Sequence, residues 1–290
     1  MNHQALANTI TVSDDAYKSI SAIIAQIDFK LTEQIKLILQ HPDWQKLESS
    51  WRGMEHLVYN TETDEKLKIR FMNLSKDELR RNMKRYKGIA WDQSPMFIAK
   101  VAASAHAPFI AGASPSVLQM DSWQELANPR DLTKIVTQNL EYAPWNSLRA
   151  SEDSRYIGLT MPRFLARLPY GAKTNPVDEF DFEEDADGSD HTKYVWSNAA
   201  YAMGVNNTFP TDDGGVDMKC PTEIAISDRR EAELAKNGFI PLIHRKNSDY
   251  AAFIGAQSLQ KPQEYYDPDA TANANLSARL PYLFAWLPLK

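Results

Sequence analysis

The residues closest to a catalytic nucleophile lie in Gly112-Ala-Ser114-Pro-Ser116. A hydrolase of the nucleophile-elbow type needs Gly-x-Ser-x-Gly, because the chain turns sharply under the serine. The second glycine is missing here, and Pro115 stands at the turn, while His106 is a lone histidine in an apolar run that is typical of a core position. A serine-type hydrolase that uses Ser114, with His106 or an acid from residues 178–190, is therefore kept only as the alternative function.

Residues 178–190 carry eight acids and no base, which are the residue types of a calcium site. With Glu183 as position 1 of an EF-hand loop, position 12 falls on Tyr194, where a bidentate glutamate is needed. We therefore expect a solvated acidic loop that faces a basic partner. The single cysteine, Cys220, can form neither an internal disulfide nor a zinc site by itself.

Other motifs for bound groups are also missing from the sequence. The histidines show no His-Glu-x-x-His spacing, and there is neither a Walker-type phosphate loop nor a Gly-x-Gly-x-x-Gly motif. The sequence therefore predicts no catalytic residue, no metal ligand and no cofactor. A protein that acts through its surfaces fits this pattern, and seven tryptophans and twelve tyrosines are residue types that often anchor interfaces.

Composition excludes several classes of protein. The chain has 290 residues, of which 43% are apolar and 24% charged, so it is neither a disordered chain nor a small disulfide scaffold. A net charge of −6 is unlike that of a strongly basic nucleic-acid binder. The uncharged run 101–120 is long enough to cross a membrane, but its prolines and glycine favour a buried strand and turns. We expect a soluble cytoplasmic protein with no nucleic-acid partner and no membrane insertion.

Two helices are predicted at the N-terminus. Ser13 is a suitable N-cap, and Pro42 suits the first turn of a second helix. Apolar residues recur at helical spacing in both helices, at Tyr17, Ile20, Ile24, Ile27 and Leu31 and then at Trp44, Leu47, Trp51, Met54 and Val58. Residues 1–62 are therefore predicted to form an N-terminal helical arm.

Residues 63–290 alternate between strand and helix patterns, so the predicted fold class is α+β, a mixed sheet with flanking helices. Ser75 and Glu78 form a capping box that opens a helix, and Ser227 or Asp228 caps another that ends before Gly238. Strands are expected over 67–72, 156–161, 222–226, 239–243 and 251–255. Two further helices are expected over 131–141 and 192–203.

Several long stretches of the sequence resemble the large subunit of the contractile sheath of the type VI secretion system. They lie between residues 41 and 285 and occur in the order of that family: 41–53, 91–95, 107–115, 158–171, 209–215, 221–230 and 253–258. Among them are His41-Pro-Asp-Trp-Gln-Lys-Leu-Glu-Ser-Ser-Trp-Arg-Gly53 and Gly158-Leu-Thr-Met-Pro-Arg-Phe-Leu-Ala-Arg-Leu-Pro-Tyr-Gly171.

The resemblance implies a phage-tail-sheath-like fold and a structural role. It implies that the chain pairs with a small sheath subunit and that these pairs stack with copies of themselves into a helical tube around an inner-tube protein. Contraction would drive the inner tube outward, and a AAA+ unfoldase would disassemble the contracted form. All of this would take place in the bacterial cytoplasm, without catalysis by this chain.

The sequence departs from the family at three places. Family members run longer near residues 97/98, near 206/207 and after 285, so we expect family segments to be missing there. The missing C-terminal portion is where the family supplies inner-tube contacts. The N-terminal arm is then the best candidate for partner contact, with Trp44, Trp51 and Leu57 as anchors, and burial within the same chain is the alternative for these three residues.

Overall fold

The computed structural model describes residues 16–61, 63–65, 67–75, 77–79, 81, 96–128, 131–186, 190–205, 208–210, 221–244 and 250–261. The expected cap at Ser13, the cysteine at 220 and the expected junctions at 206/207 and 285 lie outside these residues. The junction at 97/98 falls inside the helix α5 (Met96–Ala105).

A five-stranded mixed sheet forms the centre of the body, by which we mean the described residues from 96 onward. Its order is β1 (Phe109–Gly112), β2 (Ile157–Met161), β6 (Phe239–His244), β7 (Tyr250–Phe253) and β5 (Thr208–Pro210). The first three strands run parallel, whereas β7 is antiparallel to both β6 and β5. The predicted mixed sheet is thus confirmed.

Helices pack on both faces of this sheet, and β6 is consequently buried along its whole length. Successive residues of a strand point to opposite faces. Phe239 therefore shares one buried cluster with Leu234, while Ile240 belongs to another with Ala202. Besides α5, the helices of the body are α6 (Leu132–Gln138), α7 (Ala143–Ala150), α8 (Ala199–Val205) and α9 (Asp228–Lys236). Five 3-10 helices also occur there, at Pro115–Leu118, Trp123–Ala127, Leu140–Tyr142, Glu152–Tyr156 and His191–Lys193.

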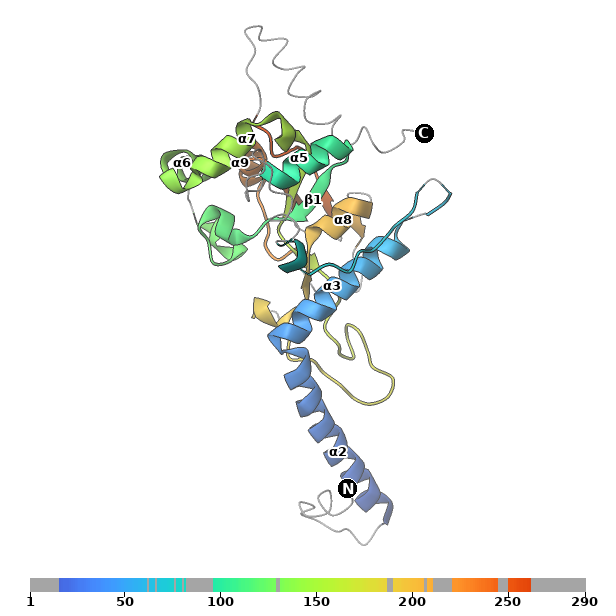
Figure 1. The fold of residues 1–290 in the computed structure, drawn as a ribbon. Coiled ribbons are helices and arrows are strands. Elements are labelled where there is room, and N and C mark those ends of the chain that lie inside the picture. The colour runs from blue at the N-terminus through green and yellow to red at the C-terminus, as the bar shows by residue number, and fades with distance from the viewer. Residues whose placement is uncertain are drawn as a thin grey trace.

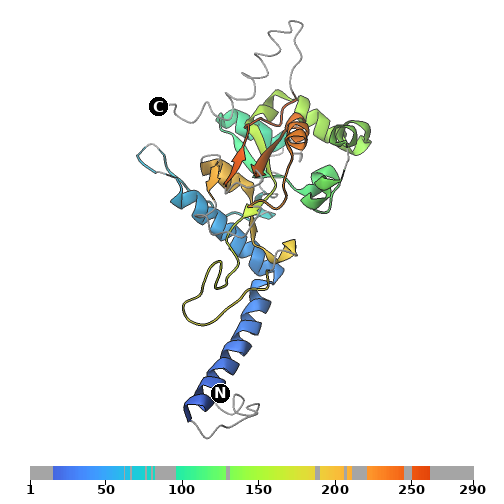
Figure 2. The same cartoon turned by 180° about the vertical axis from the view of Figure 1, so that it is seen from behind.

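The arm consists of α2 (Ala16–Leu39) and α3 (Pro42–Tyr59). Helix α3 lies against α8 and against β4 (Trp196–Ser197), which pairs with β3 (Phe164–Leu165). Two hydrogen bonds join these elements, because Ser49 Oγ donates to the carbonyl of Trp196 and Ser197 Oγ donates to the carbonyl of Ser49, each over 2.9 Å. Figures 1 and 2 show from opposite sides that α2 projects away from the body. Among the described residues, no helix has both the length and the apolar character that a membrane crossing requires.

The predicted helix starts are found at Pro42, at Ser227 and at the capping box of Ser75 and Glu78. Pro42 is the first residue of α3, and Ser227 Oγ accepts a hydrogen bond from Arg230 N at the start of α9. The capping box is also present, since Ser75 Oγ accepts from Glu78 N over 3.2 Å and a Glu78 carboxylate oxygen accepts from Ser75 N over 2.8 Å. Each of these signals is local, so the rest of the chain does not alter it.

Two strand predictions are wrong. Residues 67–72 are irregular, and Leu67 and Phe71 are 46% and 60% exposed. Within residues 222–226, only Thr222 makes a bridge, to Phe164. Alternating apolar residues are not sufficient for a strand, because a strand also needs a neighbour to satisfy its backbone groups.

Two helix predictions are too long. The helix expected over 192–203 is restricted to α8, because Trp196 and Ser197 pair with β3 instead. The helix expected over 131–141 ends at Gln138, and Leu140, expected on its buried face, is 91% exposed. The uncharged run 101–120 contains the end of α5, then β1 and a 3-10 helix, so the expected strand is only part of it.

Gly53 determines how closely α3 approaches the body. A Cβ atom at this position would lie 2.3 Å from Tyr201 Cδ2 and 2.5 Å from Ser197 Oγ. Gly→Ala in a helix normally stabilises by about 1 kcal/mol. We expect Gly53→Ala to destabilise instead, by about 1–3 kcal/mol, because the helix must move outward. Urea unfolding followed by circular dichroism measures this.

The matched control is Ser50→Ala, an exposed position on the same helix. It should change the free energy of unfolding by no more than about 0.5 kcal/mol. An unfolding midpoint for Gly53→Ala equal to or above that of the wild type would contradict the close approach of α3 to α8.

Candidate partner interface

A row of large apolar side chains lies exposed along α2. The row, here called the seam, comprises Tyr17, Ile20, Ile24, Ile27, Leu31 and Ile38, with exposed fractions of 78%, 57%, 53%, 42%, 47% and 53%. These positions are three and four residues apart in turn, with Gln34 at the one remaining place in the series. A 3–4 alternation is the spacing of a coiled-coil contact face. The seam is therefore shaped to pack against another helix.

The same spacing continues on α3 with a second exposed row. Trp44, Leu47, Trp51 and Val58 are 42%, 52%, 63% and 40% exposed. The two predicted anchors Trp44 and Trp51 thus share one open face of the helix. The third, Leu57, is half-buried, and its Cδ1 lies 2.9 Å from where a Cβ of Gly204 would be, so it packs against α8 of its own chain. The interface role of all three stays a prediction.

Helices α2 and α3 meet at an elbow, formed by Gln40 and His41. His41 has an extended backbone and its Nδ1 accepts a hydrogen bond from Asp43 N over 3.3 Å. Pro42 follows, and the residue before a proline disfavours the helical conformation. The break between the two helices is therefore fixed by sequence, although the angle between them is not.

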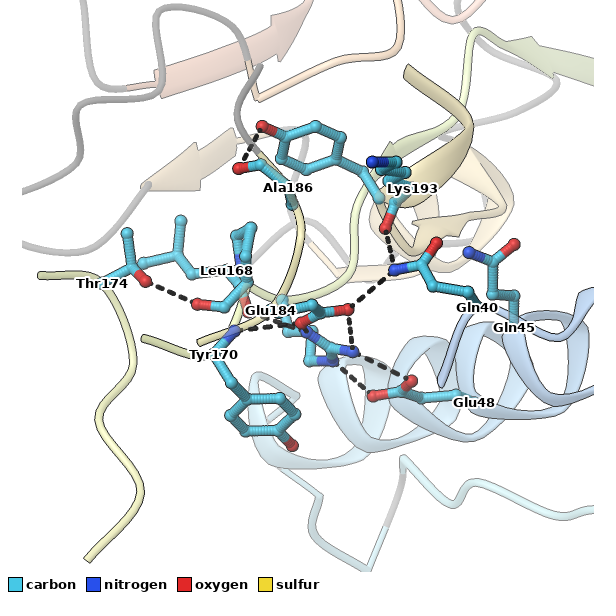
Figure 3. Close-up of polar contacts among 12 residues, drawn as sticks. Gln40, Gln45, Glu48, Leu168, Tyr170, Thr174, Glu184, Ala186 and Lys193 are labelled. Atoms are coloured by element: carbon cyan, nitrogen blue, oxygen red, sulfur yellow. Dashed lines mark hydrogen bonds and ion pairs between the residues drawn. The ribbon is translucent and has the colours of Figure 1, made fainter. Parts of the chain in front are cut away.

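Four charged groups form a network beside the elbow, and three of them are largely buried. Arg167 donates from Nη1 to Glu184 Oε2 over 2.6 Å and from Nε to Glu48 Oε1 over 2.5 Å, and Arg52 Nε also donates to Glu48 Oε1 over 2.8 Å. The side chains of Arg167 and Glu184 are only 5% and 1% exposed. Figure 3 shows the carboxylates of Glu48 and Glu184 near each other, and Arg167 donates to both. Arg167, Glu48 and Glu184 are thus paired largely away from water, whereas the side chain of Arg52 at the edge of the network is 30% exposed.

Neighbouring groups complete the network. Tyr170 N donates to Glu184 Oε2 over 3.0 Å, and the Tyr170 ring centroid is 4.3 Å from Arg167 Cζ, a cation–π contact. Gln40 Nε2 donates to Glu184 Oε1 and to the carbonyl of Lys193, each over 3.4 Å. The network therefore reaches from the body to the end of α2.

The acidic segment 178–190 is in part the expected solvated loop, because five of its described acids are exposed: Asp178, Glu179, Asp181, Glu183 and Asp185. Phe182 and Glu184 are buried, and Asp185 is 3.4 Å from Lys36 Nζ on α2. Glu184 is stable there because a buried carboxylate is tolerated when it is paired and hydrogen-bonded, and its basic partner is Arg167 of the same chain. Sequence analysis missed Arg167, although an arginine flanked by Ala166 and Leu168 in an apolar stretch indicates a buried charge that needs an acid.

The network shifts the protonation of its members. Burial alone would raise the pKa of Glu48, but hydrogen bonds and positive charge from Arg167 and Arg52 outweigh it and hold that pKa below its usual range. Burial alone would lower the pKa of Arg167, but Glu184 and Glu48 outweigh it and raise that pKa. Both pKa shifts favour the charged forms of Glu48 and Arg167 at neutral pH.

The candidate nucleophile and histidine are not brought together. Ser114 Oγ is 2.7 Å from Ser116 Oγ, and His106 Nδ1 is 3.3 Å from Tyr156 Oη. His106 precedes β1 and Ser114 follows it, so the length of the strand, roughly 13 Å at 3.3 Å per residue, separates them. His106 is an exposed turn residue rather than a core residue. Among the described residues no group of three or more His, Cys, Asp or Glu side chains could hold a metal ion.

Glu48 is expected to make stability depend on pH. Its folded-state pKa lies below 4.5, so its contribution is complete above about pH 4.5 and is lost as the pH falls through the folded value. We expect Glu48→Gln to lower the free energy of unfolding by about 1–3 kcal/mol near neutral pH, and the deficit should shrink below pH 4.5. Urea unfolding at several pH values measures it, and a deficit that is as large at low pH as at neutral pH would contradict the lowered pKa.

Comparison with known proteins agrees with the resemblance found in the sequence. Residues 21–99, 97–208 and 204–260 match the family described as EvpB/VC_A0108, tail sheath N-terminal domain. The matched stretches meet at 97–99 and 204–208, beside two of the three places where family segments are expected to be missing.

A similar protein is the type VI secretion system sheath protein TssC1 of Pseudomonas aeruginosa. It is 58% identical over 346 residues, which cover 97% of this chain and 69% of TssC1. The aligned stretch is longer than this chain of 290 residues, so TssC1 has residues within it that have no counterpart here. The family match and the similarity to TssC1 each cover most of this chain, so the chain belongs to the EvpB/VC_A0108 tail sheath family.

Proposed function

We propose that this chain is a structural subunit of the contractile sheath of a type VI secretion system. In this proposal it assembles with a small sheath subunit and with copies of itself around an inner tube, in the bacterial cytoplasm, and contraction drives secretion. Family membership and the 58% identity to a type VI sheath protein support the assignment. The proposal includes a fold related to phage tail sheaths and disassembly by a AAA+ unfoldase.

The observation that carries the proposal is the uncovered seam on α2. Fully burying one large apolar side chain contributes about 1.5–3 kcal/mol, so covering a half-exposed one contributes roughly 1 kcal/mol. Six such side chains in one row are a substantial driving force for association. A helical partner with apolar residues at the same spacing would cover them.

The apolar surface of α2 is wider than a two-helix contact. Phe29 and Leu37 lie outside the seam and are 66% and 69% exposed. A strict 3–4 seam covers only two positions in seven, whereas helices in larger bundles are apolar over a wider face. We therefore propose that α2 enters a bundle of more than two helices, in which the small subunit supplies at least one helix.

Helical assembly also places a demand on symmetry. A tube that grows needs contacts between different surfaces of successive copies, because a contact between identical surfaces closes into a dimer. The arm and the body are such different surfaces, and contraction would require two alternative packings between them. The proposal assigns no catalysis to this chain, and neither Ser114 nor His106 has a role in it.

The seam is tested by placing charges on it. Ile24→Asp with Ile27→Asp should reduce the affinity for the small sheath subunit at least a hundredfold, because two carboxylates would have to be buried without partners. The matched control, Ala22→Asp with Ala25→Asp, places the same charges on the side of the helix that carries Phe29, away from the seam, and should reduce the affinity at least tenfold less than the seam variant does. Copurification of the tagged small subunit and titration calorimetry give the affinities.

Circular dichroism must show that both double variants keep the wild-type helix content. Equal binding by the two double variants would rule out the seam as the docking surface. Failure of the wild type itself to bind the small subunit would rule out the proposed function in this form.

A further inference from the structure

Contacts with the body are made by the last turn of α2 and by the elbow that follows it. Lys36 Nζ is 3.4 Å from Asp185 Oδ1, and Gln40 Nε2 donates to Glu184 Oε1 and to the carbonyl of Lys193 over 3.4 Å. All three partners belong to the end of the acidic segment or to the 3-10 helix that follows it. The position of residues 184–186 and 191–193 therefore decides where the seam points.

Arg167 holds that segment against α3. Its Nη1 donates to Glu184 and its Nε donates to Glu48, so one guanidinium binds carboxylates on both sides of the elbow. Glu48 belongs to α3, and Asp185, the residue after Glu184, pairs with Lys36 in the last turn of α2. The connection from α3 through Arg167, Glu184 and Asp185 to Lys36 closes a triangle whose third corner is the elbow, and a closed triangle fixes the angle at that corner.

We propose that Arg167 is a positioning residue that sets the angle between α2 and α3 and so presents the seam to its partner. The effect on docking rests on the proposed function, whereas the effect on the angle does not. A planar guanidinium suits this position, because its N–H donors are held in a fixed fork that reaches two carboxylates at once. A lysine ammonium is a point charge without this fork of donors. Without Arg167, the carboxylates of Glu48 and Glu184 would face each other and repel.

The experiment separates geometry from stability by neutralising the three buried members of the network and leaving the partly exposed Arg52 unchanged. Arg167→Met combined with Glu48→Gln and Glu184→Gln removes the fork without leaving a buried unpaired charge, so the variant should still fold. Arg167→Lys keeps the charge and loses the fork. Lys134→Met is the matched control, because it removes an exposed cation paired with Asp131 far from the elbow.

The angle is measured on the isolated full chain by double electron–electron resonance. Spin labels at Ala25→Cys on α2 and Gln138→Cys on α6, with Cys220→Ser as background, report the distance between arm and body. Both labelled positions are exposed. We expect a narrow distribution for the wild-type network and for Lys134→Met, and one at least twice as wide for the triple variant. Arg167→Lys should fall between them.

Affinity for the small sheath subunit is the second readout. The triple variant should bind at least tenfold more weakly than the Lys134→Met control, because the seam is no longer held in one direction. If the triple variant gave a distance distribution as narrow as that of the wild type, the proposal that Arg167 sets the angle would be overturned. A widened distribution with unchanged affinity would overturn its role in docking. If the wild type does not bind the small subunit, the proposed function fails, and the distance measurement alone decides whether Arg167 sets the angle.

Discussion

The arrangement of this chain depends on the requirement that a buried charge be paired. Arg167 is almost fully enclosed, and its charge is compensated there because Glu48 and Glu184 accept its hydrogen bonds. These three residues come from α3, from the segment after β3 and from the acidic segment. A single electrostatic constraint therefore brings together parts of the chain that lie up to 136 residues apart, from Glu48 to Glu184.

A steric constraint acts beside the electrostatic one. Gly53 lets α3 lie against Tyr201 and Ser197, so that α3 is anchored to the body along one side and exposes Trp44 and Trp51 on the other. Helix α2 has no comparable packing against the described residues, and its 24 residues keep a row of large apolar side chains exposed. Because most helical stability in proteins comes from tertiary packing, such a helix gains stability when a partner covers it.

Sequence reasoning succeeded where the signal was local and failed where it depended on a distant partner. Pro42 and Ser227 mark helix starts whatever the rest of the chain does, and the parallel strands 157–161 and 239–244 follow from their apolar composition. Residues 67–72 have the alternation of a strand but pair with no strand in the part of the chain that the structure describes. Glu184 looks like one acid among eight, and only the fold shows that it is the one that Arg167 needs.

The two constraints give the apolar arm a definite direction before any partner arrives. Association is more favourable when the binding surface is already ordered, because less conformational freedom is lost on docking. An exposed seam on an unbraced helix would sample many directions, and each productive encounter would have to restrict them. A buried ion pair of small net stability can therefore matter more for assembly than for folding, since it sets the orientation in which the apolar surface is offered.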